Sequence, residues 1–326
     1  MQRNLLLEEK IFGITSKSEF EELALELFHF QFDHCEIYRL FSKKTGRINP
    51  SRLSEIPFLP ISFFKTHRVS CSNKREDLLF QSSGTTQTGR SKHAVAYQEI
   101  YDRSFETIYR QFIGDPEDQV ILALLPNYLE QGNSSLVYMV DSLIKKSNCS
   151  LSSFVLNEVE DLMHKYKTAL EIGKNVVIFG VSYALLDLAA LGLDLSKALI
   201  IETGGMKGRR KEMTKEELQR EIKNGLKVDF VSSEYGMTEL LSQSYSKEDG
   251  LFELPNWMNI LIRDMNDPFC NLENGKTGGI NVIDFANIYS CSFIATQDLG
   301  KIEHGKLKIM GRFDNADIRG CNLLVQ

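Results

Sequence analysis

An alternation of short, continuous apolar runs with helical segments, between residues 119 and 231, constrains the fold of this chain most. We predict four buried strands there, over residues 119–125, 176–179, 198–201 and 228–231. Strands that are apolar throughout are typical of a parallel sheet that helices cover on both faces. The sequence therefore predicts an α/β core.

Capping signals define the helices that join these strands. Helices are predicted over about 134–146, where a serine precedes the apolar pattern, and over about 183–191. Thr214 and Glu217 form a capping box for a third helix, which we expect to stop near Gly225.

The two ends of the chain differ from this core. Near the N-terminus, Ser18 and Glu21 form a predicted capping box for a helix whose apolar residues, Phe20, Leu23, Leu27 and Phe30, lie on one stripe. Past residue 255 the pattern changes to strand-like segments, over 257–263, 279–285 and 306–310. A smaller, β-rich part is therefore expected to close the chain.

The charge and cysteine content exclude several classes of protein. Lys and Arg number 38 against 44 Asp and Glu, so the net charge of −6 does not favour a nucleic-acid partner. The 6 cysteines are scattered without a C-x-x-C pair. No apolar stretch reaches the roughly 18 residues of a membrane span. We expect a cytoplasmic protein with no membrane span.

In parallel sheets, ligands bind in the loops that follow the carboxyl ends of the strands. The candidate loops are 81–93, 126–133, 180–182, 202–208 and 232–239.

The first of these loops reads Gln81-Ser-Ser-Gly-Thr-Thr-Gln-Thr-Gly-Arg-Ser-Lys-His93. Its glycines and hydroxyl groups offer many donors, and Arg90 and Lys92 supply two cations, as a polyphosphate site requires. A Walker A loop needs Lys directly after its second Gly, where Arg90 stands, and this disfavours a P-loop NTPase. A polar surface turn is the simpler alternative.

The second informative loop contains Tyr235-Gly-Met-Thr-Glu239. The Tyr235 ring is a flat surface for a purine, and Gly236 lets the backbone approach it. Thr238 adds a hydroxyl for a phosphate, and Glu239 adds an oxygen ligand suited to Mg²⁺. A structural turn is again the alternative.

In order and spacing these segments resemble the motifs of the acyl-adenylate-forming superfamily. Three further motifs fit, namely Gly204-Gly205 between the two loops, then Thr296-Gln-Asp298-Leu-Gly300 and Gly311-Arg312-Phe-Asp314. The resemblance is strongest to the acyl-protein synthetase (LuxE-like) branch. It rests there on Leu125-Pro-Asn-Tyr-Leu-Glu-Gln-Gly-Asn-Ser-Ser-Leu-Val-Tyr138 and Arg319-Gly-Cys-Asn-Leu-Leu324.

The resemblance implies a fold. We expect one adenylate-forming domain over 1–326, with layered parallel and mixed sheets. It would comprise a helical part (1–75), a nucleotide-binding α/β core (76–255) and a β-rich part (256–326) that ends in the hinge motif. The Gln87-Thr88 stretch is longer than in the usual phosphate loop. The mobile C-terminal domain of most such enzymes, which carries a catalytic lysine, is expected to be absent.

The resemblance also implies chemistry, in which ATP and Mg²⁺ activate a carboxylic acid, expected to be a fatty acid, as its acyl-adenylate. Lys92 and Glu239 would be catalytic, with Glu239 holding the metal. The nucleotide-binding residues would be Ser82, Ser83, Gly84, Thr85, Thr86, Gly89, Lys92, Gly204, Gly205, Tyr235, Gly236, Thr238, Asp298 and Arg312.

A thiol then accepts the acyl group. In the LuxE-like branch a cysteine near the C-terminus has this role, and Cys321 is placed to match it. The expected partners are an acyl-accepting protein, such as an acyl reductase or a carrier protein, or CoA. A small buried core cysteine is the alternative interpretation of Cys321.

Two other functions stay open. Gly180-Val-Ser182-Tyr-Ala184 imitates a nucleophile elbow, so that Ser182 with Asp284 or Asp298 and His304 would suit a serine hydrolase or acyltransferase. An inactive nucleotide-binding scaffold is the second. His29 and His34 are five positions apart, which does not place them on one helix face, so a metal site there is disfavoured.

Overall fold

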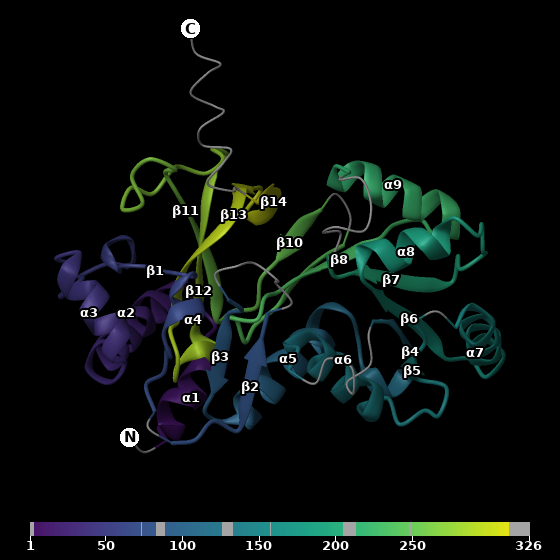
Figure 1. Ribbon diagram of the computed structural model, residues 1–326, viewed down its shortest axis with the longest axis horizontal. Coiled ribbons are helices and arrows are strands. Elements are labelled where there is room, and N and C mark those ends of the chain that lie inside the picture. Colours follow the sequence, from purple (N-terminus) through teal and green to yellow (C-terminus); the bar gives the residue numbers. More distant parts are fainter. Residues whose placement is uncertain are drawn as a thin grey trace, which may run out of the picture. The chain divides into compact units, whose positions relative to one another are not determined.

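The computed structural model describes residues 3–72, 74–82, 89–125, 133–156, 158–204, 213–247 and 250–312. The chain forms two compact units. Unit 1 comprises residues 1–101, 238–242 and 253–326, and unit 2 comprises residues 102–237 and 243–252. The architecture is the predicted mixed α/β fold (Figure 1).

Unit 2 contains the parallel sheet that the apolar runs predict. Its strands follow the order β9-β8-β7-β6-β4-β5. All are parallel to their neighbours except β9, which is antiparallel to β8. The bounds are β4 (Gln119–Leu124), β5 (Ser153–Phe154), β6 (Asn175–Gly180), β7 (Ala198–Glu202), β8 (Ser232–Tyr235) and β9 (Ser244–Ser246). The short β10 (Leu251–Glu253) straddles the unit boundary.

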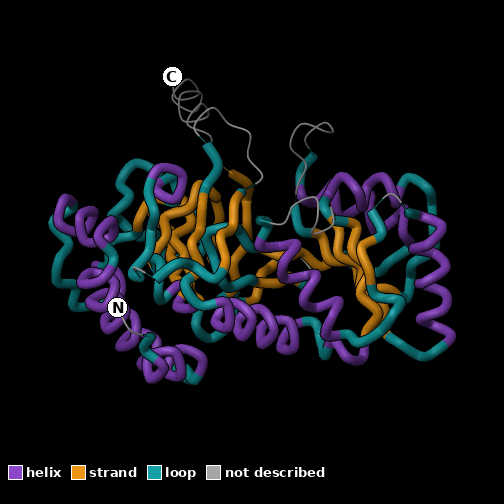
Figure 2. Tube along the Cα trace, turned by 60° about the horizontal axis from the view of Figure 1, so that its bottom comes forward, coloured by secondary structure: helices purple, strands orange, loops and turns teal. Residues whose placement is uncertain are grey.

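Helices cover both faces of this sheet (Figure 2). On one face, apolar side chains of β4, β6 and β7 pack with those of α7, α8 and α9 in a single core cluster. On the other, the Tyr109 ring of α5 stacks on Phe179 of β6 with centroids 6.2 Å apart. The bounds are α5 (Gln98–Phe112), η2 (Pro116–Asp118), α6 (Ser135–Lys146), α7 (Val159–Glu171), α8 (Ser182–Ala189) and α9 (Lys215–Leu226).

Unit 1 is built on antiparallel strands, in the order β11-β12-β13-β14, with the short β1 parallel to β13. A separate antiparallel pair consists of β2 and β3. The strands are β1 (Leu59–Pro60), β2 (Leu78–Gln81), β3 (Lys92–Val95), β11 (Met258–Arg263), β12 (Gly278–Asp284), β13 (Phe293–Glu303) and β14 (Lys306–Arg312). The predicted β-rich part beyond residue 255 is confirmed.

The N-terminal helices share the core of unit 1. Phe20 of α2 stacks on Phe285 at 4.3 Å between ring centroids. The buried amide of Gln31 donates to the carbonyls of Asn287 and Ile288, at 3.0 Å each. The helical elements are α1 (Leu5–Phe12), α2 (Lys17–His34), α3 (Glu36–Lys44), η1 (Leu53–Glu55), α4 (Phe63–Thr66) and η3 (Phe285–Asn287).

Capping predictions hold for two helices. The Ser134 side chain caps α6, and Thr214 and Glu217 form the capping box of α9. The predicted stop near Gly225 is confirmed to within one residue, since α9 ends at Leu226, although the residue with positive φ that follows it is Lys227 (φ 58°) and not a glycine. Gly225 serves a close approach instead, since a Cβ there would lie 2.4 Å from the Ala189 carbonyl oxygen.

The predicted capping box of Ser18 and Glu21 is wrong. The sequence holds two overlapping S-x-x-E patterns, and α2 uses the earlier one, formed by Ser16 and Glu19. The Glu19 carboxylate accepts from the backbone N–H of both Thr15 and Ser16, so the earlier cap satisfies an additional donor.

The fourth parallel strand lies four residues later than predicted. Residues 228–231 are not a strand, and β8 pairs with β7 through Ser232 and Ser233. Val228 and Val231 are instead buried in the helix-side core of unit 2. The apolar run therefore marks core packing, and the polar residues after it form the strand.

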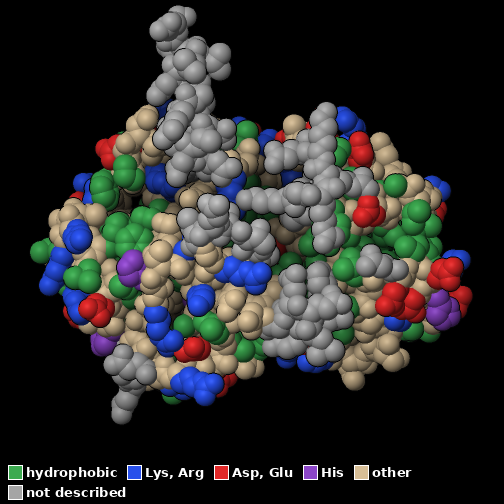
Figure 3. Space-filling view, in the orientation of Figure 1, with side chains coloured by type: hydrophobic (Ala, Val, Ile, Leu, Met, Phe, Trp, Pro, Cys, Tyr) green, Lys and Arg blue, Asp and Glu red, His purple; other side chains and the backbone are tan. Residues whose placement is uncertain are grey.

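The charged side chains on the surface reflect the similar numbers of acidic and basic residues in the sequence. Acidic and basic side chains are both visible on the face drawn in Figure 3. Among the described residues, no helix combines the length and apolar character that crossing a membrane requires.

Candidate functional site

The loop between β2 and β3 departs from its predicted setting. We expected residues 81–93 at the carboxyl end of a parallel strand, but they connect an antiparallel pair in which Gln81 is opposite Lys92. One further hydrogen-bonded pair extends it, since Ser82 N donates to Ser91 O at 3.1 Å and Ser91 N donates to Ser82 Oγ at 3.0 Å. The strands that flank the loop therefore form a hairpin.

The ends of this hairpin loop carry the predicted cations. Lys92 is the first residue of β3, and its side chain and that of Arg90 are exposed. Gly89 has φ 87°, which a residue with a Cβ adopts with strain. Four predicted phosphate-binding residues lie outside the described residues, namely Ser83, Gly84, Thr85 and Thr86.

The segment Thr238–Glu239 belongs to unit 1 and meets the β3 end of this loop. Ser91 hydrogen-bonds the Glu239 carboxylate, and the His93 ring bonds the Thr238 carbonyl oxygen through Nδ1 at 2.8 Å. From η3, Asn287 Nδ2 donates to the Glu239 carbonyl oxygen at 2.8 Å. The structure therefore brings together Thr238, Glu239 and the residues that follow the glycine- and hydroxyl-rich stretch.

The Glu239 carboxyl group is in an unusual setting for an acid. Its residue is only 6% exposed, and burial raises its pKa above the ordinary value. The hydrogen bond from Ser91 and the positive charges of Arg312 and Lys65 act in the opposite direction. A buried carboxylate facing cations is chemically suited to hold a divalent metal beside phosphates.

A buried carboxylate, that of Asp284, holds the backbone just after Glu239 through hydrogen bonds. Asp284 accepts from the backbone N–H of Leu241 at 2.8 Å and of Ser242 at 2.9 Å, and from Ser242 Oγ at 2.6 Å. The indole N–H of Trp257 donates to the same Ser242 hydroxyl at 2.8 Å. Asp284 is thus committed to holding this turn and does not serve the hydrolase triad considered above.

Asp298 and Arg312 occur at matching positions on β13 and β14. Arg312 Nε lies 3.7 Å from Asp298 Oδ1. The Asp298 backbone N–H donates to Thr296 Oγ1 at 3.1 Å. Two residues predicted from separate motifs are therefore neighbours within unit 1.

The other predicted nucleotide-binding residues lie in unit 2. Gly204 has φ 79°, and its N–H donates to Glu202 Oε1 at 2.8 Å, whereas Gly205 lies outside the described residues. The ring of Tyr235 is buried and contacts Phe252 at 6.0 Å between centroids. A Cβ on Gly236 would lie 2.2 Å from Glu234 Oε1, so only glycine fits without a shift.

Glu202 is the polar centre of unit 2, and the sequence did not single it out. The residue is 1% exposed, and one carboxylate oxygen accepts from Gly204 N and from Ser182 Oγ. The other oxygen pairs with Lys215 Nζ and accepts from Ser233 Oγ at 3.4 Å.

The structure also bears on two alternatives raised by the sequence, a serine hydrolase and a histidine metal site. The Ser182 hydroxyl is buried and donates to a carboxylate, so nothing at this serine supports the nucleophile elbow. His29 and His34 are both exposed, and no group of three His, Cys, Asp or Glu side chains gathers as a metal site in the described parts of the chain. Cys321 lies outside those parts.

Sequence reasoning missed three residues at the candidate site, Ser91, His93 and Asn287. Ser91 and His93 flank Lys92, so their closeness to the phosphate motif was the available signal. Asn287 had no such signal, because only the fold brings η3 to Glu239.

Over residues 13–326 the sequence matches the family described as acyl-protein synthetase, LuxE. A search of the curated proteins finds no match.

Several solved structures share the fold. MatB from Rhodopseudomonas palustris with bound ATP has 20% identity and a TM-score of 0.52, over 74% of this chain and 49% of that chain. A 2-hydroxyisobutyryl-CoA ligase in complex with 2-HIB-AMP and CoA has 12% identity and a TM-score of 0.66, over 92% and 70%. The anthranilate CoA ligase AuaEII with anthranoyl-AMP has 15% identity and a TM-score of 0.51, over 73% and 48%. This chain thus spans about half the length of MatB.

Proposed function

Since this chain belongs to the acyl-protein synthetase (LuxE) family, we propose that it activates a carboxylic acid with ATP and transfers the acyl group to a thiol. The single observation that carries the proposal is the meeting of Ser91 and His93 with Thr238 and Glu239. The structural relatives named above were solved with ATP, acyl-AMP or CoA, which agrees with this chemistry.

The first step of the proposed reaction makes a better leaving group. A carboxylate oxygen of the acid attacks the α-phosphorus of ATP, the bond to the β-phosphate oxygen breaks, and pyrophosphate leaves. The product is a mixed anhydride, acyl-AMP. Such a step is accelerated chiefly by positioning and by neutralising charge on the phosphate oxygens.

The residues of unit 1 would supply that neutralisation. Lys92 is exposed at the end of the hairpin loop, where its ammonium group is free to reach a phosphate. Thr238 would donate its hydroxyl, and Asp298 and Arg312 would bind ribose and phosphate. We infer that Lys92 is one of the cations that neutralise the phosphate charge in this step.

Glu239 would hold Mg²⁺. The fit is chemical, because Mg²⁺ is commonly bound by one or two carboxylates together with substrate phosphates rather than by a cage of protein ligands. The lone buried carboxylate of Glu239, with no gathered group of metal ligands around it in the described residues, has that character. The ion would neutralise negative charge on the phosphates.

The second step transfers the acyl group. A thiolate attacks the carbonyl carbon of acyl-AMP, the bond to the phosphate oxygen breaks, and AMP leaves with the electron pair. Cys321 is the proposed acceptor, and the nearby Arg319 would favour its thiolate form. A partner protein or CoA would then receive the acyl group.

Acid-dependent exchange of labelled pyrophosphate into ATP tests the first step. A panel of short-chain, long-chain and aromatic acids should show exchange with at least one class, and we expect the fatty acids to be best. Lys92→Ala should lower the rate about 10²–10³-fold. Lys145→Ala is the control, since Lys145 pairs with Asp141 on the surface of α6. Exchange that is equal with and without every acid would refute the proposal.

Mass spectrometry tests the second step. After incubation with ATP and a labelled fatty acid, the label should appear on the peptide that contains Cys321, and Cys321→Ser should abolish it. Label on the buried Cys71, or no covalent label, would remove Cys321 from the mechanism.

A further inference from the structure

We propose that His93 and Asn287 are positioning residues that aim the Glu239 carboxylate at the nucleotide, an inference that rests on the function proposed above. His93 holds the Thr238 carbonyl and Asn287 holds the Glu239 carbonyl, each at 2.8 Å. These carbonyls belong to the peptide groups on either side of the Glu239 Cα. Fixing both groups fixes the backbone dihedrals of Glu239 and therefore the direction of its side chain.

The two residues reach this peptide from different elements. His93 lies on β3, one residue after Lys92, and Asn287 ends η3. Ser91 completes the arrangement by bonding the carboxylate itself. Glu239 is thus held at the two carbonyls beside its Cα and at its carboxyl group, and two of the three contacts come from Ser91 and His93, the residues on either side of the proposed phosphate-binding lysine.

The bond to Thr238 determines the tautomer of His93. A carbonyl oxygen only accepts, so Nδ1 carries the proton, and the buried Nε2 has no hydrogen-bond partner. Burial lowers the pKa of His93 to about 4, so the ring is neutral near pH 7. Its edge-to-face contact with Phe64, at 5.6 Å between centroids, fixes the plane of the ring.

Stability alone does not account for these side chains. Both residues are 0% exposed. Each has one bonded polar atom and one buried acceptor without a partner, Nε2 in His93 and Oδ1 in Asn287. An unpartnered buried acceptor is destabilising. The one side-chain hydrogen bond of His93 goes to Thr238, and that of Asn287 goes to Glu239. Holding these two residues is therefore the role that we assign to both side chains.

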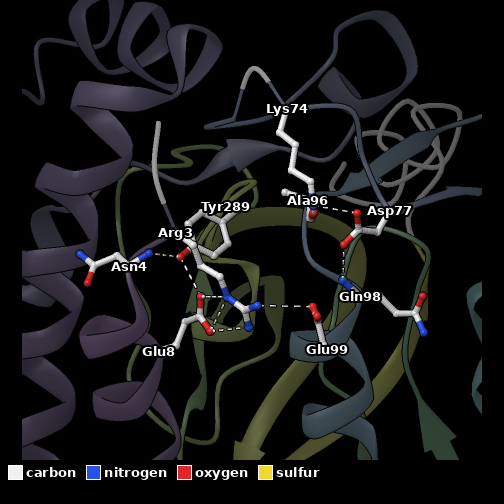
Figure 4. Close-up of polar contacts among 9 residues, drawn as sticks. All are labelled: Arg3, Asn4, Glu8, Lys74, Asp77, Ala96, Gln98, Glu99 and Tyr289. Atoms are coloured by element: carbon white, nitrogen blue, oxygen red, sulfur yellow. Dashed lines mark hydrogen bonds and ion pairs between the residues drawn. The ribbon is translucent and has the colours of Figure 1, made fainter.

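Two hydroxyl groups that line the same cavity as the His93 ring are bonded to other partners. His93 and Asn287 line one small cavity together with Tyr97, Tyr289 and Ser290. Figure 4 shows that the Tyr289 hydroxyl is already engaged, since it accepts from Asn4 N at 2.7 Å and donates to Glu8 Oε1 at 2.8 Å. The Ser290 hydroxyl donates to the Val69 carbonyl at 3.4 Å.

The Tyr97 ring, which lines this cavity, is held in place by two cationic side chains. The guanidinium of Arg3 and the ammonium of Lys74 both lie over the Tyr97 ring, at 4.8 and 4.6 Å from its centroid. Arg3 also pairs with Glu8, and Lys74 pairs with Asp77 (Figure 4). The ring of His93 is therefore held in rigid surroundings, as a positioning residue requires.

A pair of substitutions at His93 separates positioning from packing. The side-chain amide nitrogen of Asn overlays Nδ1 of His, whereas that of Gln overlays Nε2. His93→Asn should therefore keep acid-dependent pyrophosphate exchange near the wild-type rate, and His93→Gln should lose about 10–100-fold in kcat. Asn287→Leu, which removes the donor at nearly constant shape, should show the same loss with little change in melting temperature.

Two further measurements make the test independent of activity. Nitrogen-15 NMR of the histidine rings should show His93 as the neutral Nδ1–H tautomer, and in Asn287→Leu this tautomer should persist. Tyr38→Phe is the structural control, because it removes a buried hydrogen bond to the Pro57 carbonyl in the same unit. It should lower the melting temperature and leave kcat unchanged.

The outcomes distinguish the two proposals. If the wild-type protein shows no acid-dependent exchange, the proposed function fails. If the wild type is active but His93→Gln and Asn287→Leu match it, only the positioning role fails. An Nε2–H tautomer of His93 in the folded protein would also overturn the positioning role.

Discussion

The two units bury ionisable groups beside proposed nucleotide segments in opposite ways. In unit 1, burial lowers the pKa of the base His93 to about 4, so the ring stays neutral and donates to a carbonyl. In unit 2, burial and the charge of Glu202 raise the pKa of the acid Glu234 to about 8, so this carboxyl group stays protonated at pH 7.

The way each unit fixes its backbone also differs. In unit 1 two neutral side chains each hold one carbonyl next to Glu239. In unit 2 one carboxylate, that of Glu202, gathers four donors and holds the Gly204 turn. In unit 1 the carbonyls on either side of the Glu239 Cα are thus held by neutral side chains, and the Asp284 carboxylate holds only the backbone N–H groups that follow. In unit 2 a buried carboxylate holds the Gly204 turn directly.

Matched Glu→Gln substitutions give the largest expected contrast. Glu239→Gln removes the charge proposed to hold Mg²⁺ and should lower acyl-AMP formation about 10²–10³-fold. Glu234→Gln replaces a protonated acid with an amide of the same shape and should change the rate less than about twofold. Equal losses of activity in both variants would contradict the assignment of a charged carboxylate to Glu239 and a protonated acid to Glu234.

Glu202→Ala should destabilise unit 2 by about 3 kcal/mol, because it leaves Ser182, Gly204 and Lys215 without their shared partner. Urea unfolding measures the loss, and hydrogen exchange should place it in residues 175–235. A loss confined to residues of unit 1 would contradict the role assigned to Glu202.

The two units should respond to pH in opposite directions. Unfolded His93 binds its proton near pH 6.5 and folded His93 near 4, so protonation favours unfolding as the pH falls. Unit 1 should lose about 2 kcal/mol between pH 7 and pH 5. Glu234 acts in the other direction, since its raised pKa stabilises unit 2 at low pH and this stabilisation fades as the pH rises to about 8.

Hydrogen exchange measured at about pH 5, 7 and 8.5 checks both slopes by unit, because this range spans the ordinary His pKa of 6.5 and the raised Glu234 pKa of about 8. In His93→Asn the acid-dependent loss in unit 1 should disappear. Parallel slopes in both units would show that these two groups do not dominate the pH response.

The smallest expected effect concerns the helix caps, one in each unit. Ser16→Ala and Thr214→Ala each remove a capping-box hydroxyl and should cost about 1 kcal/mol. Ser18→Ala should cost almost nothing, because Ser18 lies inside α2. Thermal unfolding of the three variants measures this, and a larger effect at Ser18 would contradict the observed helix start.

The sequence was most informative where one local signal decides the structure. The continuous apolar runs of β4, β6 and β7 predicted buried parallel strands, and the capping residues Ser134 and Thr214 predicted helix starts. The sequence was least informative where pairing between strands far apart in the chain determines the structure. β13 was not predicted at all, although it is the longest strand of unit 1, since it pairs with β1, β12 and β14 and carries polar residues.

The candidate site shows the same division. Thr238 and Glu239 were predicted from a local motif, and the structure brings them to the loop that precedes β3. Asn287 and Glu202 could not be predicted, because their importance comes from contacts 48 and 20 positions away along the chain, with Glu239 and Ser182. The roles of all these residues in binding ATP remain predictions.

The most direct test of the central claim is the detection of acyl-AMP itself. The protein is mixed with ATP, Mg²⁺ and a fatty acid, quenched in acid, and the extract is analysed by mass spectrometry. We expect acyl-AMP from the wild type and almost none from a Glu239→Gln variant that folds equally well. Tight ATP binding by the wild type without any acyl-AMP would contradict it and would favour a nucleotide-binding scaffold.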